Sequence, residues 1–219
     1  MNRIDTVLFD LDGSLIDTAP DMALALELLC EEQQQPKLPF ERVRPRVSDG
    51  SAALVRLAFG EHLDDARLEQ LKQRYLTIYE AHLAVHSQPF PQIESLLQQL
   101  AARNMKWGVV TNKPGWLTTP LLEQLGLAQS AACIVSGDCT PNRKPHPEPM
   151  HRACELAGSE AQQCLYVGDA QRDIEAGNNA GMTTLVACYG YIDADTDLSG
   201  WQADGLIEQP GDILQHIDD

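Results

Sequence analysis

The feature that most constrains the fold is an alternation of strand and helix patterns from Pro89 to the end of the chain. Short apolar runs rich in β-branched residues predict strands, at 106–110, 133–135, 164–167, 183–187 and 206–207. Amphipathic stretches between them predict helices, at 93–103, 114–125, 147–157, 174–180 and from Ile213 onward. Repeated β-α units favour a mostly parallel sheet with helices on both faces. We therefore expect a doubly wound α/β fold.

The first 86 residues follow a different pattern. A short buried strand is predicted at 4–9, and helical periodicity follows over 20–32, 51–59 and 64–85. The segment between the first two of these helices is mixed and holds three proline breakers. Since 19–86 holds no convincing strand pattern, we expect two domains: a core made of residues 1–18 and 87–219, and a helical insert made of residues 19–86.

The charge balance excludes some classes of partner. The 219 residues include 16 Lys+Arg and 32 Asp+Glu, for a formal net charge of −16. This charge argues against a nucleic-acid surface and against binding to an acidic membrane. Six cysteines are scattered without a Cys-x-x-Cys pair, as expected for reduced thiols in the cytoplasm. No apolar run approaches the length of a membrane span, so we expect neither a span nor a signal peptide.

Residues 7–18 join an apolar strand to two carboxylates. Asp10 and Asp12 lie two residues apart, and the alternation of side chains along a strand lets both start out on one side. Like charges this close require a cation or a proton between them, and Gly13 permits a sharp turn of the backbone. Taken alone, the stretch is also compatible with a strand that runs into an ordinary acidic turn.

Three further polar sets lie at or just beyond the ends of predicted strands: Thr111 with Asn112, Arg143 with Lys144, and Asp169 with Asp173. Each set alone is compatible with a helix N-cap, a solvated basic pair or an acidic loop. In open α/β sheets, however, ligands bind at the carboxyl ends of the strands. Four polar sets at one sheet edge therefore indicate a functional site.

The chemistry that uses such groups is phosphoryl transfer through an enzyme carboxylate. Hydrolysis of phosphate monoesters is among the slowest uncatalysed reactions, and a carboxylate nucleophile divides it into two easier displacements. A second acid can protonate the leaving oxygen and then activate water. Mg²⁺ suits carboxylate and phosphate oxygens and relieves the repulsion among Asp10, Asp169 and the phosphate. A lysine and a threonine hydroxyl can hold the remaining phosphate oxygens.

At these four places the sequence resembles the haloacid dehalogenase superfamily, and its phosphatases in particular. The matching motifs occur in the family's order and span nearly the whole chain: Asp10-Leu11-Asp12-Gly13-Ser14, Thr111-Asn112, Lys144-Pro145 and Gly168-Asp169-Ala170-Gln171-Arg172-Asp173. Ser14 stands where threonine is more usual, and Ala170 where the family often has aspartate or a hydroxyl residue. The resemblance implies a Rossmann-like core with a mobile helical cap between the first two motifs.

The resemblance also implies roles for the matched residues. Asp10 is the implied nucleophile, and Asp12 the general acid and base. The implied stabilisers of the phosphate and the intermediate are Thr111, Asn112 and Lys144. The implied cofactor is Mg²⁺, held by Asp10, Asp169 and the backbone carbonyl of Asp12, with Asp173 in support. The other residues that we assign to phosphate or substrate binding near these motifs are Leu11, Gly13 and Lys113.

Within the superfamily the chain is similar to phosphoglycolate phosphatases, and more so to the bacterial N-acetylmuramic acid 6-phosphate phosphatases of cell-wall recycling. The similarity rests on stretches outside the catalytic positions: residues 84–87, 107–114, 189–192 and 201–204. It implies a small-molecule phosphate monoester as substrate, with N-acetylmuramic acid 6-phosphate first and phosphoglycolate as the alternative. We expect a monomer or a homodimer.

Rival activities differ in what they require. A dehalogenase of the same fold lacks the second acid, because an alkyl halide needs no proton on its leaving group, so Asp12 argues against it. A phosphomutase keeps all four motifs and stays open as an alternative. A receiver domain, the signalling rival, is about half this length and has no helical insert. No P-loop or dinucleotide fingerprint is present, so we expect no nucleotide cofactor.

The predicted cap holds polar residues with two interpretations. Arg44, Ser48 and Gly50 are candidate substrate contacts, although a charged solvated face is equally compatible with them. His82 and His86 are four residues apart on a predicted helix, a spacing that can hold zinc. Without a third ligand type nearby, we expect them to be surface or interface residues.

Overall fold

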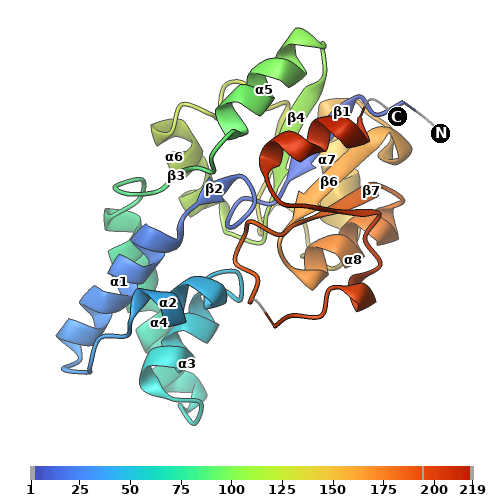
Figure 1. Ribbon diagram of the computed structural model, residues 1–219. Helices are drawn as coiled ribbons and strands as arrows, with labels where there is room; N and C mark the ends of the chain where they lie inside the picture. The colour runs from blue at the N-terminus through green and yellow to red at the C-terminus, as the bar shows by residue number, and fades with distance from the viewer. Residues whose placement is uncertain (1–2, 194, 218–219) are drawn as a thin grey trace.

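The computed structural model describes residues 3–193 and 195–217. Within those residues a six-stranded sheet has the order β5-β4-β1-β6-β7-β8, and every neighbouring pair of strands is parallel (Figure 1). The strands are β1 (Thr6–Phe9), β4 (Lys106–Val110), β5 (Cys133–Val135), β6 (Cys164–Gly168), β7 (Thr183–Ala187) and β8 (Gly205–Ile207). The predicted α/β fold with a mostly parallel sheet is confirmed.

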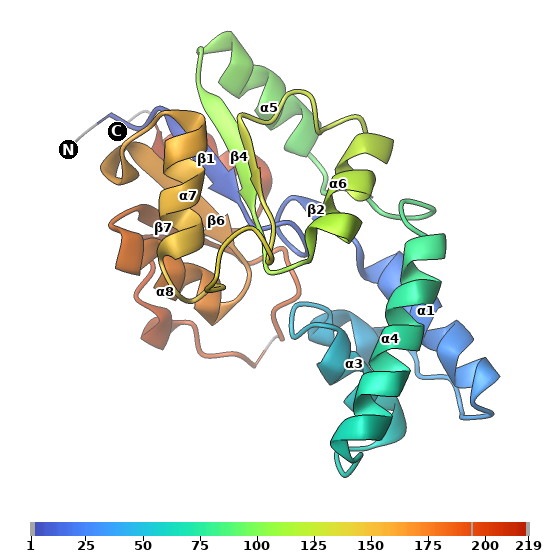
Figure 2. The ribbon, with the colours of Figure 1, turned by 180° about the vertical axis from the view of Figure 1, so that it is seen from behind.

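Helices cover both faces of the sheet. One face packs on α7 (Glu148–Ala157) and α8 (Gln171–Ala180), which lie in front in Figure 2. The other face packs on α5 (Ile93–Ala102), α6 (Gly115–Gln124) and the 3₁₀ helix η4 (Pro210–His216). Strand β1 serves both layers: Val7 and Phe9 belong to the second, and Leu8 to the first. This alternation is the two-residue period of a strand buried on both sides.

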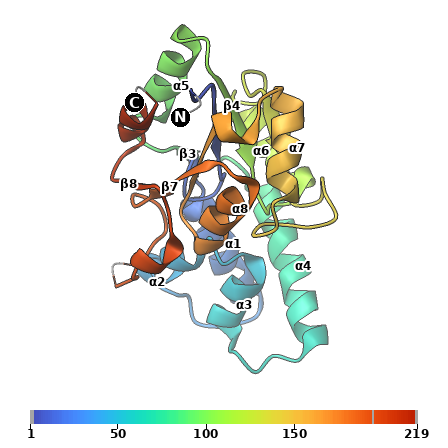
Figure 3. The same cartoon turned by 90° about the vertical axis from the view of Figure 1, so that its right-hand side faces the viewer.

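The residues between β1 and α5 form a group of helices beyond the carboxyl edge of the sheet (Figures 1 and 3). They are α1 (Ala19–Glu32), α2 (Phe40–Val43), η1 (Arg44–Arg46), α3 (Ser51–Phe59) and α4 (Asp65–Ala81). Long helices α1 and α4 pack on each other, and α3 packs on α4. The predicted division of the chain into a core and a helical domain stays a prediction. Residues 1–2, 194 and 218–219 of that predicted core lie outside the described residues.

Two short strands carry the chain between the sheet and these helices. β2 (Ile16–Asp17) pairs with β3 (Gln88–Pro89) in an antiparallel ribbon. The buried carboxylate of Asp21 accepts hydrogen bonds from the backbone N–H groups of His86 and Ser87 and from the Ser87 hydroxyl. The segment that leaves the sheet and the segment that returns to it are therefore hydrogen-bonded to each other. Strands of two residues are too short for a sequence pattern to reveal.

Other boundaries differ from the predictions where a side chain caps the backbone. Helix α8 begins at Gln171 rather than at 174, because Asp173 Oδ2 accepts the N–H of Ala170. The predicted helix from Ile213 is a 3₁₀ helix from Pro210, with Asp212 capping its start. Short 3₁₀ helices also occur at η2 (Ala161–Gln163) and η3 (Ser199–Trp201). In the part of the chain that the structure describes, no helix combines the length and the apolar character needed to cross a bilayer.

Candidate active site

Three polar residues directly follow three neighbouring strands. Asp10 follows β1, Thr111 follows β4 and Asp169 follows β6, and β1 lies between the other two. Backbone hydrogen bonds hold this edge: the N–H of Asp10 donates to Val167 over 2.8 Å, and that of Thr111 to Val135 over 2.9 Å. The carboxyl ends of parallel strands meet at one edge, which is why residues distant in sequence converge here.

Three of the predicted metal-binding carboxylates form a buried cluster. Oxygens of Asp10, Asp169 and Asp173 all lie within 4.8 Å of one another, and the residues are 3%, 3% and 0% exposed. Burial, and then the charges of Asp10 and Asp173, raise the pKa of Asp169 to about 7. Burial also raises the pKa of Asp173. The cluster is therefore short of positive charge.

Lys144 is the cation that reaches into this cluster. Its Nζ donates to Asp10 Oδ1 over 2.8 Å, to the carbonyl of Val110 over 2.9 Å and to the hydroxyl of Tyr166 over 2.8 Å. It also lies 2.7 Å from Oδ1 of Asp173. The carboxamide of Asn112 makes two 3.0 Å hydrogen bonds with the backbone of Lys144, one as donor and one as acceptor. Asn112 thus positions Lys144.

The cluster has the donor set of a divalent-cation site. Oδ1 of Asp173 is buried, and its one polar contact among the described residues is the 2.7 Å ion pair with Nζ of Lys144, an ammonium that it shares with Asp10. The ammonium of Lys144 and the guanidinium of Arg172, which interacts with all three carboxylates, supply two positive charges against three negative ones. Hard oxygen ligands of this kind suit Mg²⁺. The residues present therefore fit such an ion.

Asp169 is held from several directions. Oδ2 accepts from the hydroxyl of Ser48 over 2.8 Å and from the N–H of Tyr191 over 3.0 Å, while Ser14 donates to Oδ1 over 3.4 Å. The backbone at Gly13 has φ +91°, and a Cβ there would lie 2.1 Å from Oδ2 of Asp169. Only glycine allows both this conformation and this approach.

Asp12 lies outside the carboxylate cluster and has its own partners. Its Oδ1 accepts from the hydroxyl of Thr18 over 2.6 Å and from Nζ of Lys113 over 2.8 Å. Lys113 also donates to the hydroxyl of Tyr79 over 2.9 Å. Lys113 is thus held by the second carboxylate of the first motif, an arrangement that the sequence does not reveal.

A cavity of about 720 Å³ opens on this edge of the sheet. Of the predicted site residues, those that line it are Asp10, Asp12, Ser48, Gly50, Thr111, Asn112 and Lys113. Its wall holds four cationic side chains, from Lys72, Lys113, Arg143 and Arg172, and four carboxylates, from Asp10, Asp12, Asp49 and Asp138. In a chain with a formal net charge of −16, this balance makes the cavity a place where an anion can bind.

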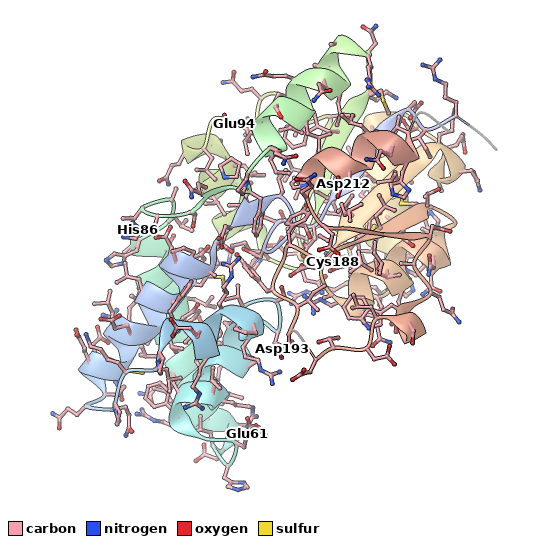
Figure 4. All side chains as sticks on the ribbon, in the orientation of Figure 1. Glu61, His86, Glu94, Cys188, Asp193 and Asp212 are labelled. Atoms are coloured by element: carbon pink, nitrogen blue, oxygen red, sulfur yellow. The ribbon has the colours of Figure 1, made fainter. Side chains whose placement is uncertain are left out.

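The structure does not bring every predicted site residue into the cavity wall. Arg44 binds both oxygens of Asp17, over 2.7 and 2.9 Å, beside the ring of Tyr191. Leu11 is fully buried, and Gly13 packs on Asp169 rather than lining the cavity. His82 contacts the backbone carbonyl of Ile78, and His86 is exposed (Figure 4). The chemical roles of all predicted residues stay predictions.

Sequence reasoning assigns no role to three tyrosines that hold this site. Tyr166 contacts Lys144, Tyr79 contacts Lys113, and the hydroxyl of Tyr191 accepts from the N–H groups of Thr18 and Ala19. Tyr191 lies in residues 189–192, one of the stretches on which the similarity to the phosphatases rests. This is the one feature of the sequence that points to a role for Tyr191. Buried tyrosines at strand and helix positions otherwise look like ordinary core residues.

Comparison with known proteins identifies the family to which this chain is similar. The family model for haloacid dehalogenase-like hydrolases matches residues 7–187. A phosphoglycolate phosphatase from Xanthomonas campestris pv. campestris (strain 8004) is 45% identical over 209 residues, covering 95% of this chain and 94% of that protein. An N-acetylmuramic acid 6-phosphate phosphatase from Pseudomonas aeruginosa PAO1 is 38% identical over 216 residues, covering 99% of this chain and 96% of that protein.

Solved structures agree with the sequence relatives. The crystal structure of a predicted phosphoglycolate phosphatase from Haemophilus somnus 129PT has a TM-score of 0.86 with this chain at 28% identity and covers 99% of both chains. The family match, the parallel sheet and the carboxylates at its edge lead to one assignment. The chain belongs to the haloacid dehalogenase-like hydrolase family and is a phosphoric monoester hydrolase.

Proposed function

We propose that the protein hydrolyses a small-molecule phosphate monoester in a Mg²⁺-dependent reaction through a phosphoryl group on Asp10. The observation that carries the proposal is the placement of Asp10, which pairs with Lys144, neighbours Asp169 and Asp173, and lines the 720 Å³ cavity. A nucleophilic carboxylate, a fixed cation and a cavity for the substrate are the parts that this chemistry requires.

The metal would be held by Asp10, Asp169 and Asp173, with the backbone carbonyl of Asp12 as a further ligand. When bound, Mg²⁺ supplies positive charge that offsets the repulsion between the carboxylates and the phosphate. Lys144 holds Oδ1 of Asp10, which leaves Oδ2 as the attacking oxygen. Thr111 lines the cavity, and its hydroxyl would hold a phosphate oxygen.

In the first step, an oxygen of Asp10 forms a bond to phosphorus while the bond from phosphorus to the leaving oxygen breaks. The electron pair of that bond goes to the leaving oxygen, which takes a proton from Asp12 and departs as an alcohol. In the second step, Asp12 takes a proton from water, the water oxygen attacks phosphorus, and the electron pair of the broken bond returns to Asp10. Inorganic phosphate, the carboxylate of Asp10 and the protonated side chain of Asp12 result.

The substrate that we propose is N-acetylmuramic acid 6-phosphate. The cavity is within the range of about 300–1,000 Å³ for pockets that enclose ligands of sugar-phosphate size and above. Its wall offers the apolar side chains of Leu76 and Trp116 beside the amide of Gln73 and the cations of Lys72 and Arg143. A sugar ring with hydroxyl groups and a carboxylate presents matching chemistry. This substrate belongs to cell-wall recycling in the cytoplasm, and the free thiols of all six cysteines are typical of a reducing compartment.

Phosphoglycolate is the second candidate, because the relative with 45% identity is a phosphoglycolate phosphatase. A two-carbon acid fills only a small part of the cavity. Phosphomutase activity is a third candidate on the motifs alone.

The test is phosphate release by purified protein, with Mg²⁺ or with a chelator, from N-acetylmuramic acid 6-phosphate, phosphoglycolate and a panel of hexose phosphates. We expect the highest kcat/KM on the first of these and no release with the chelator. Preference for phosphoglycolate would overturn the sugar assignment alone. Isomerisation of a hexose phosphate without phosphate release would indicate a mutase, and no turnover of any ester would overturn the proposed function.

A further inference from the structure

One contact joins the helices around α4 to the acid and base of the proposed reaction. The hydroxyl of Tyr79, near the end of α4, lies 2.9 Å from Nζ of Lys113, which follows β4 in the core. The same ammonium lies 2.8 Å from Oδ1 of Asp12. Tyr79 is 1% exposed and Lys113 is 8% exposed, so water does not compete strongly for either contact.

The two oxygens of Asp12 differ in their surroundings. Lys113 and the hydroxyl of Thr18 both donate to Oδ1. Among the residues that the structure describes, none donates to Oδ2, although Asp12 lines the cavity. The proton of a general acid has to sit on the oxygen that faces the substrate. Holding Oδ1 from two sides therefore selects Oδ2 for proton transfer.

We propose that Tyr79 is a positioning residue for proton transfer: its hydroxyl holds Lys113, and Lys113 holds Oδ1 of Asp12 so that Oδ2 faces the leaving oxygen of the substrate. This inference rests on the proposed function. When the ester bond breaks, the leaving oxygen takes the electron pair and then the proton from Oδ2, and Asp12 becomes a carboxylate beside the ammonium. Lys113 thus also offsets the charge that develops on Asp12.

Lys113 needs a second partner to do this. A lysine side chain has four rotatable carbon bonds and loses much rotamer freedom when it is held in one position. Among the described residues Asp12 is the one charged partner of Lys113, and with this partner alone the ammonium can swing toward the phosphate or the open cavity. The hydroxyl of Tyr79 restricts the motion of the ammonium, because the ring that carries it is held in place. That ring is buried and stacks on the ring of Tyr75, with 6.4 Å between the ring centroids and 10° between the ring planes.

The matched control is the neighbouring tyrosine. Tyr75 lies one turn earlier on α4, is fully buried, and stacks on Tyr79. Its hydroxyl donates to the backbone carbonyl of Met22 over 3.1 Å rather than to Lys113. Tyr75→Phe and Tyr79→Phe therefore each remove one buried hydroxyl from the same helix while the rings keep the packing. Only the second removes a contact to a side chain that itself donates a hydrogen bond to Asp12.

The readout is the dependence of kcat on the leaving group. An alkyl phosphate needs a proton on its leaving oxygen, whereas p-nitrophenyl phosphate releases a stable phenolate without one. The experiment measures kcat and KM for both variants on p-nitrophenyl phosphate and on the alkyl phosphate that the wild-type protein hydrolyses best in the panel above.

We expect Tyr79→Phe to lower kcat on the alkyl phosphate by about tenfold and on p-nitrophenyl phosphate by less than about twofold, with little change in KM. Tyr75→Phe should leave the ratio of the two kcat values as in the wild type. Equal losses on both substrates, or a change confined to KM, would overturn the positioning role while the proposed function stands. A wild-type protein that releases no phosphate from any ester would overturn the proposed function, and this inference with it.

Discussion

Nζ of Lys144 lies 2.8 Å from Oδ1 of Asp10, and the two side chains are 1% and 5% exposed. Burial acts to lower the pKa of the lysine, but the nearby carboxylates outweigh burial and raise that pKa above its ordinary value. Lys144 therefore stays charged at neutral pH. Its charge is a structural partner of the carboxylates, and the proposed function also assigns it a role in holding the phosphate at Asp10.

Replacing Lys144 with methionine removes this charge while keeping a side chain of similar length. The variant removes the ion-pair partner of two buried carboxylates, Asp10 and Asp173, so we expect the free energy of unfolding at pH 7 to fall by about 3–5 kcal/mol. We expect kcat to fall by about 10²–10³. Urea unfolding and phosphate release measure the two effects. Lys37→Met is the control, because Lys37 is half-exposed and pairs with surface glutamates. Unchanged turnover in Lys144→Met would contradict the proposed role.

Asp10→Asn tests the nucleophile. The substitution removes the attacking carboxylate and also one charge from a repulsive cluster, so we expect loss of phosphate release without loss of the fold. Steady-state kinetics and circular dichroism measure the two. Asp5→Asn lies just before the other end of the same strand and should behave as the wild type. Near-normal turnover in Asp10→Asn would exclude Asp10 as the nucleophile.

Gly13→Ala separates backbone strain from damage to the site. Gly13 and Gly60 both have positive φ, +91° and +103°, so alanine costs about 1–2 kcal/mol of stability at either position. Only at Gly13 does the new Cβ meet another group, at 2.1 Å from Oδ2 of Asp169, whereas nothing lies within 4 Å at Gly60. We expect a larger fall in melting temperature for Gly13→Ala than for Gly60→Ala, because only the first adds a clash to the backbone strain, and loss of Mg²⁺-dependent activity in Gly13→Ala alone. Full activity in that variant would show that Asp169 tolerates displacement.

The raised pKa of Asp169 predicts how stability depends on pH. Its pKa is about 7 in the folded protein and at its ordinary, lower value in the unfolded chain. The folded state thus holds a proton that the unfolded state has already lost, and this contribution is full at low pH and disappears as pH rises through 7. In the absence of metal, the free energy of unfolding should therefore fall between pH 5 and pH 8, as measured by urea unfolding.

Magnesium should reverse this trend, because it replaces the proton as the partner of the carboxylates. Saturating Mg²⁺ should raise the free energy of unfolding by about 2–3 kcal/mol at pH 8 and by much less at pH 5. In Asp169→Asn both the pH slope and the Mg²⁺ effect should shrink. Equal stabilisation by Mg²⁺ at both pH values would place the ion elsewhere.

Periodicity predicts the sheet of this protein because its central strands are buried on both faces and consist of short apolar runs, such as Val7–Phe9 in β1. The convergence of Asp10, Thr111 and Asp169 then follows from parallel topology alone, since each lies just after a strand. Whether these residues act as predicted is a question for the variants above.

No periodic pattern in the sequence predicts contacts between side chains that are distant in the chain. Tyr79 and Lys113 are 34 residues apart, and neither the helix pattern around the one nor the strand end beside the other predicts their contact. Arg44 shows the same limit, because its pairing with Asp17 depends on how a 3₁₀ turn meets the β2–β3 ribbon. The sequence identifies groups with the right chemistry, while the packing of helices decides which of them meet.

Strand β1 has hydrogen-bonded neighbours along both of its edges, β4 and β6. The strand that leads to Asp10 is therefore an interior strand of the sheet and not an edge strand. Heating or mild denaturant should loosen the edge strand β8 before it disturbs β1. Thermal inactivation should therefore coincide with melting of the central strands rather than with loosening of β8, and amide exchange near Phe9 should be among the slowest in the chain.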